Sequence, residues 1–399
     1  MANEKIVVLQ GPDRVRKRPA VIFMSDEIEG VQNAVRILLE IFAVEAQLGR
    51  CKHLLVKQNG ADLEISGDDR GIYLGQDNGD DSVWKNTFCE LYAASACAPD
   101  ESGYSFGLLS SSHCALYGDE IKPNSIYLPT EHGLFELCAI QYASEYMDVC
   151  VNRDGVKSTL HLQKGYNIGG ILNEATEEQN GTCFRFKMDR EVFTQTVLPA
   201  SFFTETLDAF AMLSPGLNCK YVNAVTGKEV EFFYPHGMKD YVQAKGSTAP
   251  VYIKKIEAKG KERYNRAEYE ACVEVAIGAT SFTGNTRCIH NFRELTYGGT
   301  HYEQLQKQVC RAFNDCFQSC IASDDSLTFD ELSKHLTVIL ATWCSPYCSV
   351  WENGIRLSIK NKLITDMTYD AVGRAFCDYV YAHRETLQRI VDAILEERK

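Results

Sequence analysis

Residues 30–49 read Gly-Val-Gln-Asn-Ala-Val-Arg-Ile-Leu-Leu-Glu-Ile-Phe-Ala-Val-Glu-Ala-Gln-Leu-Gly, and this stretch carries the clearest structural signal in the chain. Its apolar side chains recur at helical spacing, and Gly49 is a typical residue for ending a helix. The segment 53–66 that follows reads as two short strands around Asn59-Gly60, a dipeptide that favours a tight hairpin turn. The region therefore predicts a long amphipathic helix leading into a β-hairpin.

Further strands are expected beyond this region. Residues 147–162 predict a hairpin turning at Asp154-Gly155, and 181–187 predict another strand. Residues 218–233 predict a third hairpin, which we expect to open a β-rich domain that continues through 251–282. The C-terminal part is expected to be helical over 300–322 and 365–397, whereas the lead at 5–18 is expected to be extended or loop-like.

Composition limits the class of protein. A chain of 399 residues suits two or three domains, and 45% hydrophobic with 24% charged residues describes a globular protein. No run of 18 apolar residues and no apolar signal core at the start is present, which predicts a cytoplasmic protein with no membrane span. The net charge of −13 argues against a broad DNA-binding surface. The 16 cysteines form no Cys-x-x-Cys pair, so reduced thiols are expected.

Six groups of residues resemble the ATPase half of the DNA gyrase B protein, and they occur in that family's order. The resemblance implies an α+β protein: a GHKL-type (Bergerat) α/β sandwich over 1–215, with a lid or insertion at about 74–131, and a ribosomal-protein-like β-α transducer domain over 216–399. The segments that carry it are Val15–Pro19 with Glu45–Gly49, Asp69–Ile72, Ala143–Tyr146 with Arg153–Gly155, Gly181–Phe186, Thr226–Glu229 with Asp240–Val242, and Gly298–His301 with Leu327-Thr328.

The helix at 30–48 is where similar proteins keep their hydrolytic residues. They use a Glu as the general base and, four residues later, an Asn that orients magnesium. Counting without gaps puts Ile37 at the base position and Ile41 at the magnesium position. Glu40 is the neighbouring carboxylate, but it projects about 100° away from Ile41 on a helix. A shift of three places brings Glu40 to the base position and Val44 to the metal position, so neither register supplies both groups. Read from the residues alone, the two isoleucines face the core.

The resemblance places the adenine site at 67–72. The family's Asp-x-Gly-x-Gly motif uses its Asp to accept a hydrogen bond from the adenine amine. Aligning on Arg70, Gly71 and Ile72 puts Gly67 at the Asp position. Asp68 is one residue away and is the candidate substitute; a solvated turn is the alternative reading.

Two further positions match the pocket of similar proteins. Thr182 matches the threonine that supports the adenine-bound water, although a strand threonine needs no ligand to explain it. Glu45 and Arg70 match a pair that braces the pocket, with a surface ion pair as the alternative.

The phosphate-binding elements of the family are altered. Of the glycine-rich loop, Glu131-His132-Gly133 survives, with Phe135 where a glycine would let the backbone approach a phosphate; His132 and Gly133 remain candidates for phosphate contact. The serine-rich 107–113 is an alternative anion loop. Arg356 lies where the family's Gln-Thr-Lys loop brings a lysine to the terminal phosphate, and it is either a replacement cation or an ordinary loop cation.

Taken together, the residues favour a gyrase-B-like module of a type II topoisomerase that no longer hydrolyses ATP. ATP and magnesium are the cofactors that the family implies, yet the matching positions do not supply their ligands. Partners are expected to be a second copy or an intact gyrase or topoisomerase subunit, with DNA contacted only indirectly. The alternative is an active ATP-dependent subunit whose unusual site uses Asp68, Glu40 and Arg356. A third reading is a different small ligand in the vacated pocket.

Overall fold

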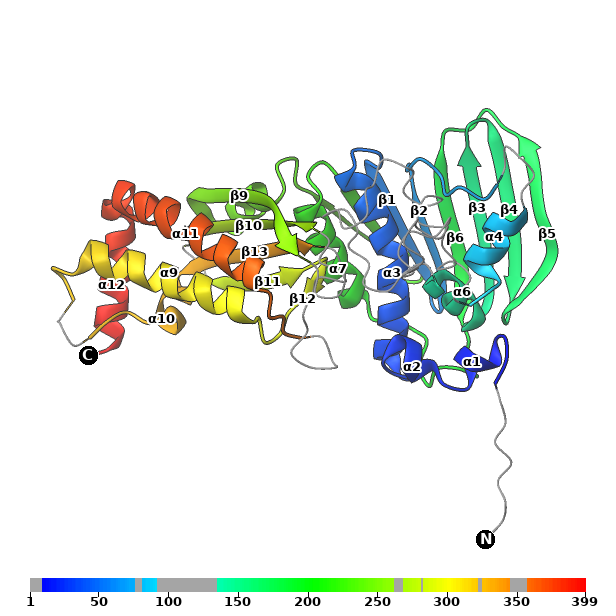
Figure 1. The fold of residues 1–399 in the computed structure, drawn as a ribbon, viewed down its shortest axis with the longest axis horizontal. Helices are drawn as coiled ribbons and strands as arrows, with labels where there is room; N and C mark the ends of the chain where they lie inside the picture. Colours follow the sequence, from blue (N-terminus) through cyan, green and yellow to red (C-terminus); the bar gives the residue numbers. More distant parts are fainter. Residues whose placement is uncertain are drawn as a thin grey trace, which may run out of the picture. The chain divides into compact units, whose positions relative to one another are not determined.

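The computed structural model describes residues 9–75, 81–91, 135–261, 268–280, 283–321, 325–344 and 357–399. These residues form two units, and the boundary between them falls between Phe233 and Tyr234. Each unit has its own β-sheet and its own helices (Figure 1). Among the described helices, none is both long and apolar enough to span a membrane.

The first unit is built on an eight-stranded sheet with the order β5-β4-β3-β6-β2-β1-β7-β8. All neighbours are antiparallel except β1 and β7, which run parallel. Burial alternates along the central strands, which is the pattern of a sheet with one face against a core. The strands are β1 His53–Asn59, β2 Asp62–Gly67, β3 Ser144–Arg153, β4 Val156–Gln163, β5 Tyr166–Ala175, β6 Gly181–Met188, β7 Asn218–Asn223 and β8 Lys228–Phe233.

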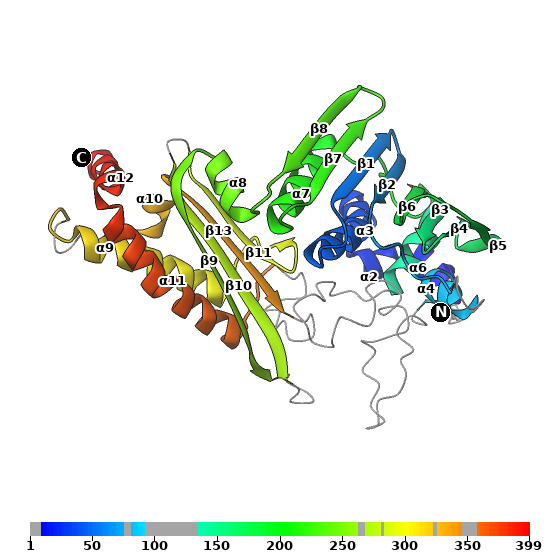
Figure 2. The same ribbon diagram turned by 90° about the horizontal axis from the view of Figure 1, so that it is seen from above.

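Helix α3 crosses this sheet and forms the centre of its core. It spans Ile28–Gln47 and ends at Gly49, whose φ of 74° is the left-handed conformation expected at a helix stop. Figure 2 shows α3, α6 and α7 on the same side of the sheet. The other described helices of this unit are α1 Asp13–Arg16, α2 Pro19–Phe23, α4 Asp81–Phe88, α6 Phe135–Tyr142 and α7 Ala200–Leu213.

The hairpin β7–β8 belongs to the first unit, not to the second. Strand β7 pairs in parallel with β1, with Leu54 opposite Cys219, and so extends the eight-stranded sheet. The boundary expected at 215/216 therefore moves to 233/234. The hairpin itself was visible in the sequence, but its partner strand is more than 150 residues away and leaves no local signal.

The second unit has a five-stranded sheet with the order β12-β11-β13-β10-β9. Strand β13 is buried at every position, consistent with its place at the centre of the sheet. Helices α9 and α11 lie side by side along this sheet (Figures 1 and 2). The elements are α8 Met238–Ala244, β9 Ser247–Lys261, β10 Glu268–Thr280, β11 Asn285–His290, β12 Arg293–Glu294, α9 Thr300–Phe317, α10 Phe329–Ser333, β13 Leu336–Cys344, α11 Lys362–Ala382 and α12 Arg384–Glu397.

The predicted long helix, the three hairpins, the strand at 181–187 and the C-terminal helices are present in the described residues. The prediction of an extended or loop-like segment at 5–18 was wrong in part, because Asp13–Arg16 form a short helix, α1. The sequence interpretation also missed α7, β5 and β13. Of the proposed lid at 74–131, the described part contains α4, and most of the rest lies outside the described residues.

Candidate functional site

The positions matched to the family's base and metal ligand lie on α3. Ile41 is 2% exposed and belongs to the core, while Ile37 is partly buried. Glu40 is also buried, at 7% exposed. The two isoleucines carry no side-chain oxygen or nitrogen atom, so neither can ligate magnesium or accept a proton from water.

The Asp68 carboxylate binds the residues at the start of strand β1. Its Oδ1 accepts hydrogen bonds from the backbone amides of Lys52 (2.7 Å) and His53 (2.8 Å), and its Oδ2 lies 2.6 Å from His53 Nδ1. Partial burial alone would raise the pKa of Asp68, but these hydrogen bonds hold it below its usual value. The carboxylate thus ties the end of β2 to the start of β1, and it is not the one that reaches Thr182.

Asp69 is the carboxylate that lies against Thr182. It is 3% exposed; its Oδ1 accepts from the Thr182 amide at 2.7 Å and its Oδ2 from the Thr182 hydroxyl at 2.8 Å. The Gly71 amide donates to the same Oδ2 at 3.1 Å, and the Thr182 hydroxyl also accepts from the Ile72 amide at 3.2 Å. Burial raises the Asp69 pKa to about 6 in spite of these bonds.

The sequence interpretation did not include Asp69 among the site residues, because the alignment placed it at a family glycine. In the structure, hydrogen bonds of Asp69 and Thr182 bring Thr182, Gly71 and Ile72 together, as expected. The signal that could have found Asp69 is its position just after β2, opposite the strand that carries Thr182. Gly67, not Asp69, is the direct cross-strand partner of Thr182.

Gly67 has no room for a side chain. A Cβ atom added there would lie 2.5 Å from Cδ1 of Phe42 and 3.1 Å from the His53 carbonyl oxygen. Phe42 is fully buried on α3, directly after Ile41, and its ring packs edge-on against Phe184 of β6 with centroids 6.2 Å apart. The aromatic ring therefore fills the space into which an aspartate at position 67 would project.

Glu45 pairs with Arg50 rather than with Arg70. Glu45 is 1% exposed, and its Oε1 accepts from Arg50 Nη2 at 2.7 Å. Burial raises the Glu45 pKa to about 7, because the Arg50 charge offsets only part of the lost hydration. The side-chain brace expected between Glu45 and Arg70 is absent from the described residues, and the Glu45–Arg50 pair found instead is part-buried, with 2% of the Glu45 and 16% of the Arg50 side chain exposed.

The loop after Asp69 is held by β3. Gly71 has a φ of 84°, and a Cβ there would lie 2.5 Å from the Asn152 carbonyl oxygen. Arg153 donates to the Gly71 carbonyl at 2.9 Å and lies over the Tyr73 ring at 5.2 Å. Ile72 is 1% exposed. These contacts make residues 69–73 a packed connection rather than a solvated turn.

The remaining candidates fall outside the described residues. These are His132 and Gly133 of the phosphate loop, the serine-rich 107–113, and Arg356. Within the described part of the chain, no group of three or more His, Cys, Asp or Glu side chains is arranged to hold a metal ion. The described cysteines carry free thiols.

Similarity to known proteins extends over nearly the whole chain. The family profile described as DNA gyrase B matches residues 237–399. The DNA gyrase B protein of Thermotoga maritima is 24% identical over 98% of this chain and 57% of its own length, and that of Treponema pallidum is 22% identical over 98% and 59%. The chain is thus similar to DNA gyrase B proteins over nearly its whole length, and its residues 237–399 match their family profile. It spans somewhat more than half the length of these curated relatives.

Solved structures of the family share the fold of this gyrase-B-like chain. The 43K ATPase domain of Thermus thermophilus gyrase B, crystallised with an aminocoumarin, superposes with a TM-score of 0.66 at 19% identity over 98% of this chain and 95% of that one. The gyrase B protein of Myxococcus xanthus gives 0.67 at 14% identity over 92% and 95%. The topoisomerase IV ATP-binding domain of Francisella tularensis gives 0.63 at 15% over 97% and 96%. The expected α+β fold, a GHKL-type domain followed by a transducer domain, is confirmed.

Proposed function

We propose that this chain is the ATPase–transducer module of a type II topoisomerase that has lost ATP turnover and acts through dimerisation or partner binding. The observation that carries the proposal is the packing of Phe42 against Gly67. The family's adenine-binding aspartate has no space at this position, because the ring lies where its first side-chain carbon would be.

Two further features support the proposal. Ile37 and Ile41 offer no ligand for magnesium and no base for water. Asp68 is engaged by Lys52 and His53, so it is not free to replace the missing carboxylate. The described side chains therefore do not fit an adenine nucleotide with magnesium, and no hydrolytic step is assigned to them.

One observation favours a second candidate function, nucleotide binding without hydrolysis. Asp69 and Thr182 place a carboxylate and a hydroxyl together at the end of β2, as a nucleotide base requires. In this case Asp69, not Asp68, would be the residue that holds the ligand.

Calorimetry with a non-hydrolysable ATP analogue and magnesium tests both candidates. The non-binding proposal expects no heat up to about 1 mM analogue. Binding at micromolar concentration would overturn it. If Asp69→Ala abolished that binding and Asp68→Ala did not, the second candidate would hold. If only Asp68→Ala abolished it, the result would support the alternative of an active site that uses Asp68.

We also propose that the working form is a homodimer, or a heterodimer with an intact gyrase or topoisomerase IV subunit, in the cytoplasm, and that DNA is contacted only through that assembly. The support is the similarity to gyrase B: the relatives are named as subunits, and the net charge of −13 disfavours direct DNA binding. Sedimentation analysis of the pure chain, and of mixtures with gyrase subunits, tests the assembly. A monomer in every mixture would contradict it.

A further inference from the structure

Two partly exposed cysteines face each other on neighbouring strands of the first unit. Cys150 of β3 is the direct cross-strand partner of Cys183 of β6. Residues directly opposite each other in an antiparallel pair have Cα atoms about 4.5–5.5 Å apart. A disulfide spans Cα separations of about 4.4–6.8 Å, so the backbone already holds the two thiols within bonding range. Among the strand pairings of the described residues, this is the one that sets a cysteine against a cysteine.

Both thiols project from the face of the sheet that carries no described helix. Side chains alternate between the two faces along a strand. Val151, next to Cys150, is fully buried, and Phe184, next to Cys183, packs against Phe42 of α3. The two cysteines therefore point away from α3, α6 and α7, which lie together on the other side of the sheet (Figure 2).

The side chains that flank this pair on the same face are small. Thr159 of β4 lies opposite Cys150, and Ser66 of β2 lies opposite Cys183. The row Thr159, Cys150, Cys183 and Ser66 thus crosses four strands with no bulky side chain between its members. Both thiols are partly exposed, so a small molecule in solution can reach them.

The surroundings keep both groups protonated at neutral pH. Burial raises the pKa of Cys150 and raises that of Cys183 to about 11, and the nearby Arg185 offsets only part of this effect. Because the thiolate is the form that attacks a disulfide, oxidation of the pair is slow at pH 7 and becomes faster toward pH 9. The charged side chains around the two thiols are Lys57, Glu64, Lys157, Glu174, Glu178 and Arg185.

We propose that Cys150 and Cys183 are a redox-sensitive pair, which low-molecular-weight disulfides such as oxidised glutathione convert into a cross-strand disulfide between β3 and β6. Cysteine pairs of this kind are the usual exception to the rule that thiols stay reduced inside cells. Thr182 faces the opposite side of the sheet, toward Asp69, so this inference does not depend on the proposal about nucleotides.

The reaction is an exchange in two steps. One cysteine thiolate attacks a sulfur atom of the small disulfide, which forms a mixed disulfide and releases one small thiol. The second cysteine thiolate then attacks the protein sulfur of the mixed disulfide, which closes the protein S–S bond and releases the second small thiol. The two cysteines lose two protons and two electrons, and the small disulfide gains them as two thiols.

Oxidation of the full chain tests the proposal. The reduced protein is incubated with oxidised glutathione at about pH 8.5, where enough thiolate is present. The remaining thiols are alkylated in denaturant, and linked peptides are mapped by mass spectrometry after proteolysis without reduction. We expect a peptide pair joined through Cys150 and Cys183, which dithiothreitol separates.

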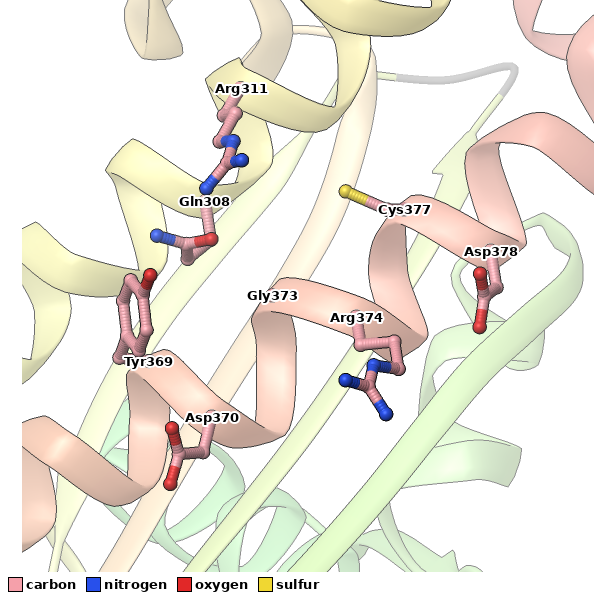
Figure 3. A pocket seen from close by; sticks show the side chains of 8 residues that line it. All are labelled: Gln308, Arg311, Tyr369, Asp370, Gly373, Arg374, Cys377 and Asp378. Carbon is pink, nitrogen blue, oxygen red and sulfur yellow. The ribbon is translucent and has the colours of Figure 1, made fainter.

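Other accessible thiols of the same chain show that the reagent has acted. Cys320, just after α9, is exposed, and Cys377 on α11, whose thiol Figure 3 shows, is partly exposed. Both lie outside the strands, with no cysteine on a paired strand opposite them. Glutathione adducts on these two residues without a link between Cys150 and Cys183 would overturn the proposal. Adducts on Cys150 and Cys183 in place of the link would also overturn it.

Two matched variants locate the chemistry. Cys150→Ser and Cys183→Ser each keep the size of the side chain and leave one thiol of the pair. In each variant we expect the reaction to stop at the mixed disulfide, so that the remaining cysteine carries glutathione. A remaining cysteine that becomes linked to a third cysteine as readily as in the wild-type pair would contradict the assignment. Circular dichroism checks that the variants are folded, and the map of the wild-type protein decides the question if one of them is not.

Discussion

A Cβ atom at Gly67 would lie 2.5 Å from Cδ1 of Phe42, so a large side chain on α3 and a missing one on β2 share a single space. Phe42 is fully buried and also packs against Phe184. Interiors are close-packed, so the two positions are coupled: one must be small when the other is large.

The first prediction concerns this coupling. Gly67→Asp alone should strongly destabilise the fold, because the side chain collides with the Phe42 ring. Phe42→Ala alone should cost about 3–5 kcal/mol as a cavity. The double variant should be more stable than the sum of the two by about 1–3 kcal/mol, since the aspartate enters the space that the ring leaves. Urea unfolding of the four proteins measures the coupling energy.

A control is available on another helix, α7. Phe203 stacks on Tyr221 at 5.1 Å and is not among the nearest neighbours of Gly67. Phe203→Ala combined with Gly67→Asp should be additive within about 0.5 kcal/mol. If Phe42→Ala and Gly67→Asp were also additive, positions 42 and 67 would not share a space.

The second prediction is a pH dependence due to Asp69. Burial raises its pKa from 3.8 to about 6, so the folded state keeps a proton that the unfolded state releases. The contribution of Asp69 to stability is therefore fully present below about pH 4 and falls as the pH rises to about 6, by an amount on the order of 3 kcal/mol. Asp69→Asn cannot titrate, so the stability difference between wild type and variant should shift in favour of the variant over this interval.

Urea unfolding of wild type and Asp69→Asn at half-unit steps from pH 4 to 8 measures the difference in their free energies of unfolding. Glu45→Gln should show the same sign over a slightly higher interval, because burial raises the Glu45 pKa from 4.5 to about 7. Asp68→Asn serves as the contrast: the Asp68 pKa is lowered, so its contribution is lost toward acid. A wild-type-to-Asp69→Asn difference that is constant from pH 4 to 7 would refute the assignment.

The third prediction concerns the metal and base positions. Installing the family residues as Ile37→Glu with Ile41→Asn should not create ATP hydrolysis, because Phe42 still occupies the space beside Gly67. Ile41 is 2% exposed, so its replacement by an amide should cost about 2–4 kcal/mol. Phosphate release and urea unfolding report the two effects. Magnesium-dependent turnover in this variant, absent from a matched wild-type preparation, would show that the helix positions alone had silenced the site.

The fourth prediction concerns Arg398, which joins α12 to the start of α10. Its Nε and Nη2 donate to the two carboxylate oxygens of Glu331 at 2.6 and 2.7 Å, and Thr328 completes a capping box with the same glutamate. The Arg398 hydrogen bonds lower the Glu331 pKa to about 2. Arg398→Ala should cost about 1–2 kcal/mol at pH 7, a figure reduced for the partial exposure of both side chains.

The sign of its pH dependence is opposite to that of Asp69. A lowered carboxylate pKa stabilises the fold above about pH 4.5, and the effect is lost as the pH falls toward 2. The difference between wild type and Arg398→Ala should therefore shrink in acid. Lys399→Ala is the control and should leave stability within about 0.5 kcal/mol of wild type. An Arg398→Ala effect that is unchanged at low pH would mean that the ion pair with Glu331 does not carry it, and that packing and the hydrogen bonds to the carbonyls of Asp325 and Ser326 do.

Sequence reasoning identified the elements whose signal is local. Apolar periodicity located α3, and Asn59-Gly60 located the β1–β2 turn, because both depend on neighbours within a few residues. It chose Asp68 where the structure brings Asp69 to Thr182. Adjacent residues in an irregular connection can point in opposite directions, and only the contacts made by each side chain settle which one faces the site.

The sequence by itself determined the α+β fold class and showed that positions 37, 41 and 67 carry Ile, Ile and Gly. The fold class could be read because helical and strand periodicity and turn motifs depend on residues close together in the chain. Only the tertiary structure decided that Phe42 fills the space beside Gly67, that Asp69 holds Thr182, and that β7 joins β1. These relationships join residues that are 25 to more than 150 positions apart. They arise from close packing and from the pairing of buried polar groups, which act across space and leave no periodic trace in the chain.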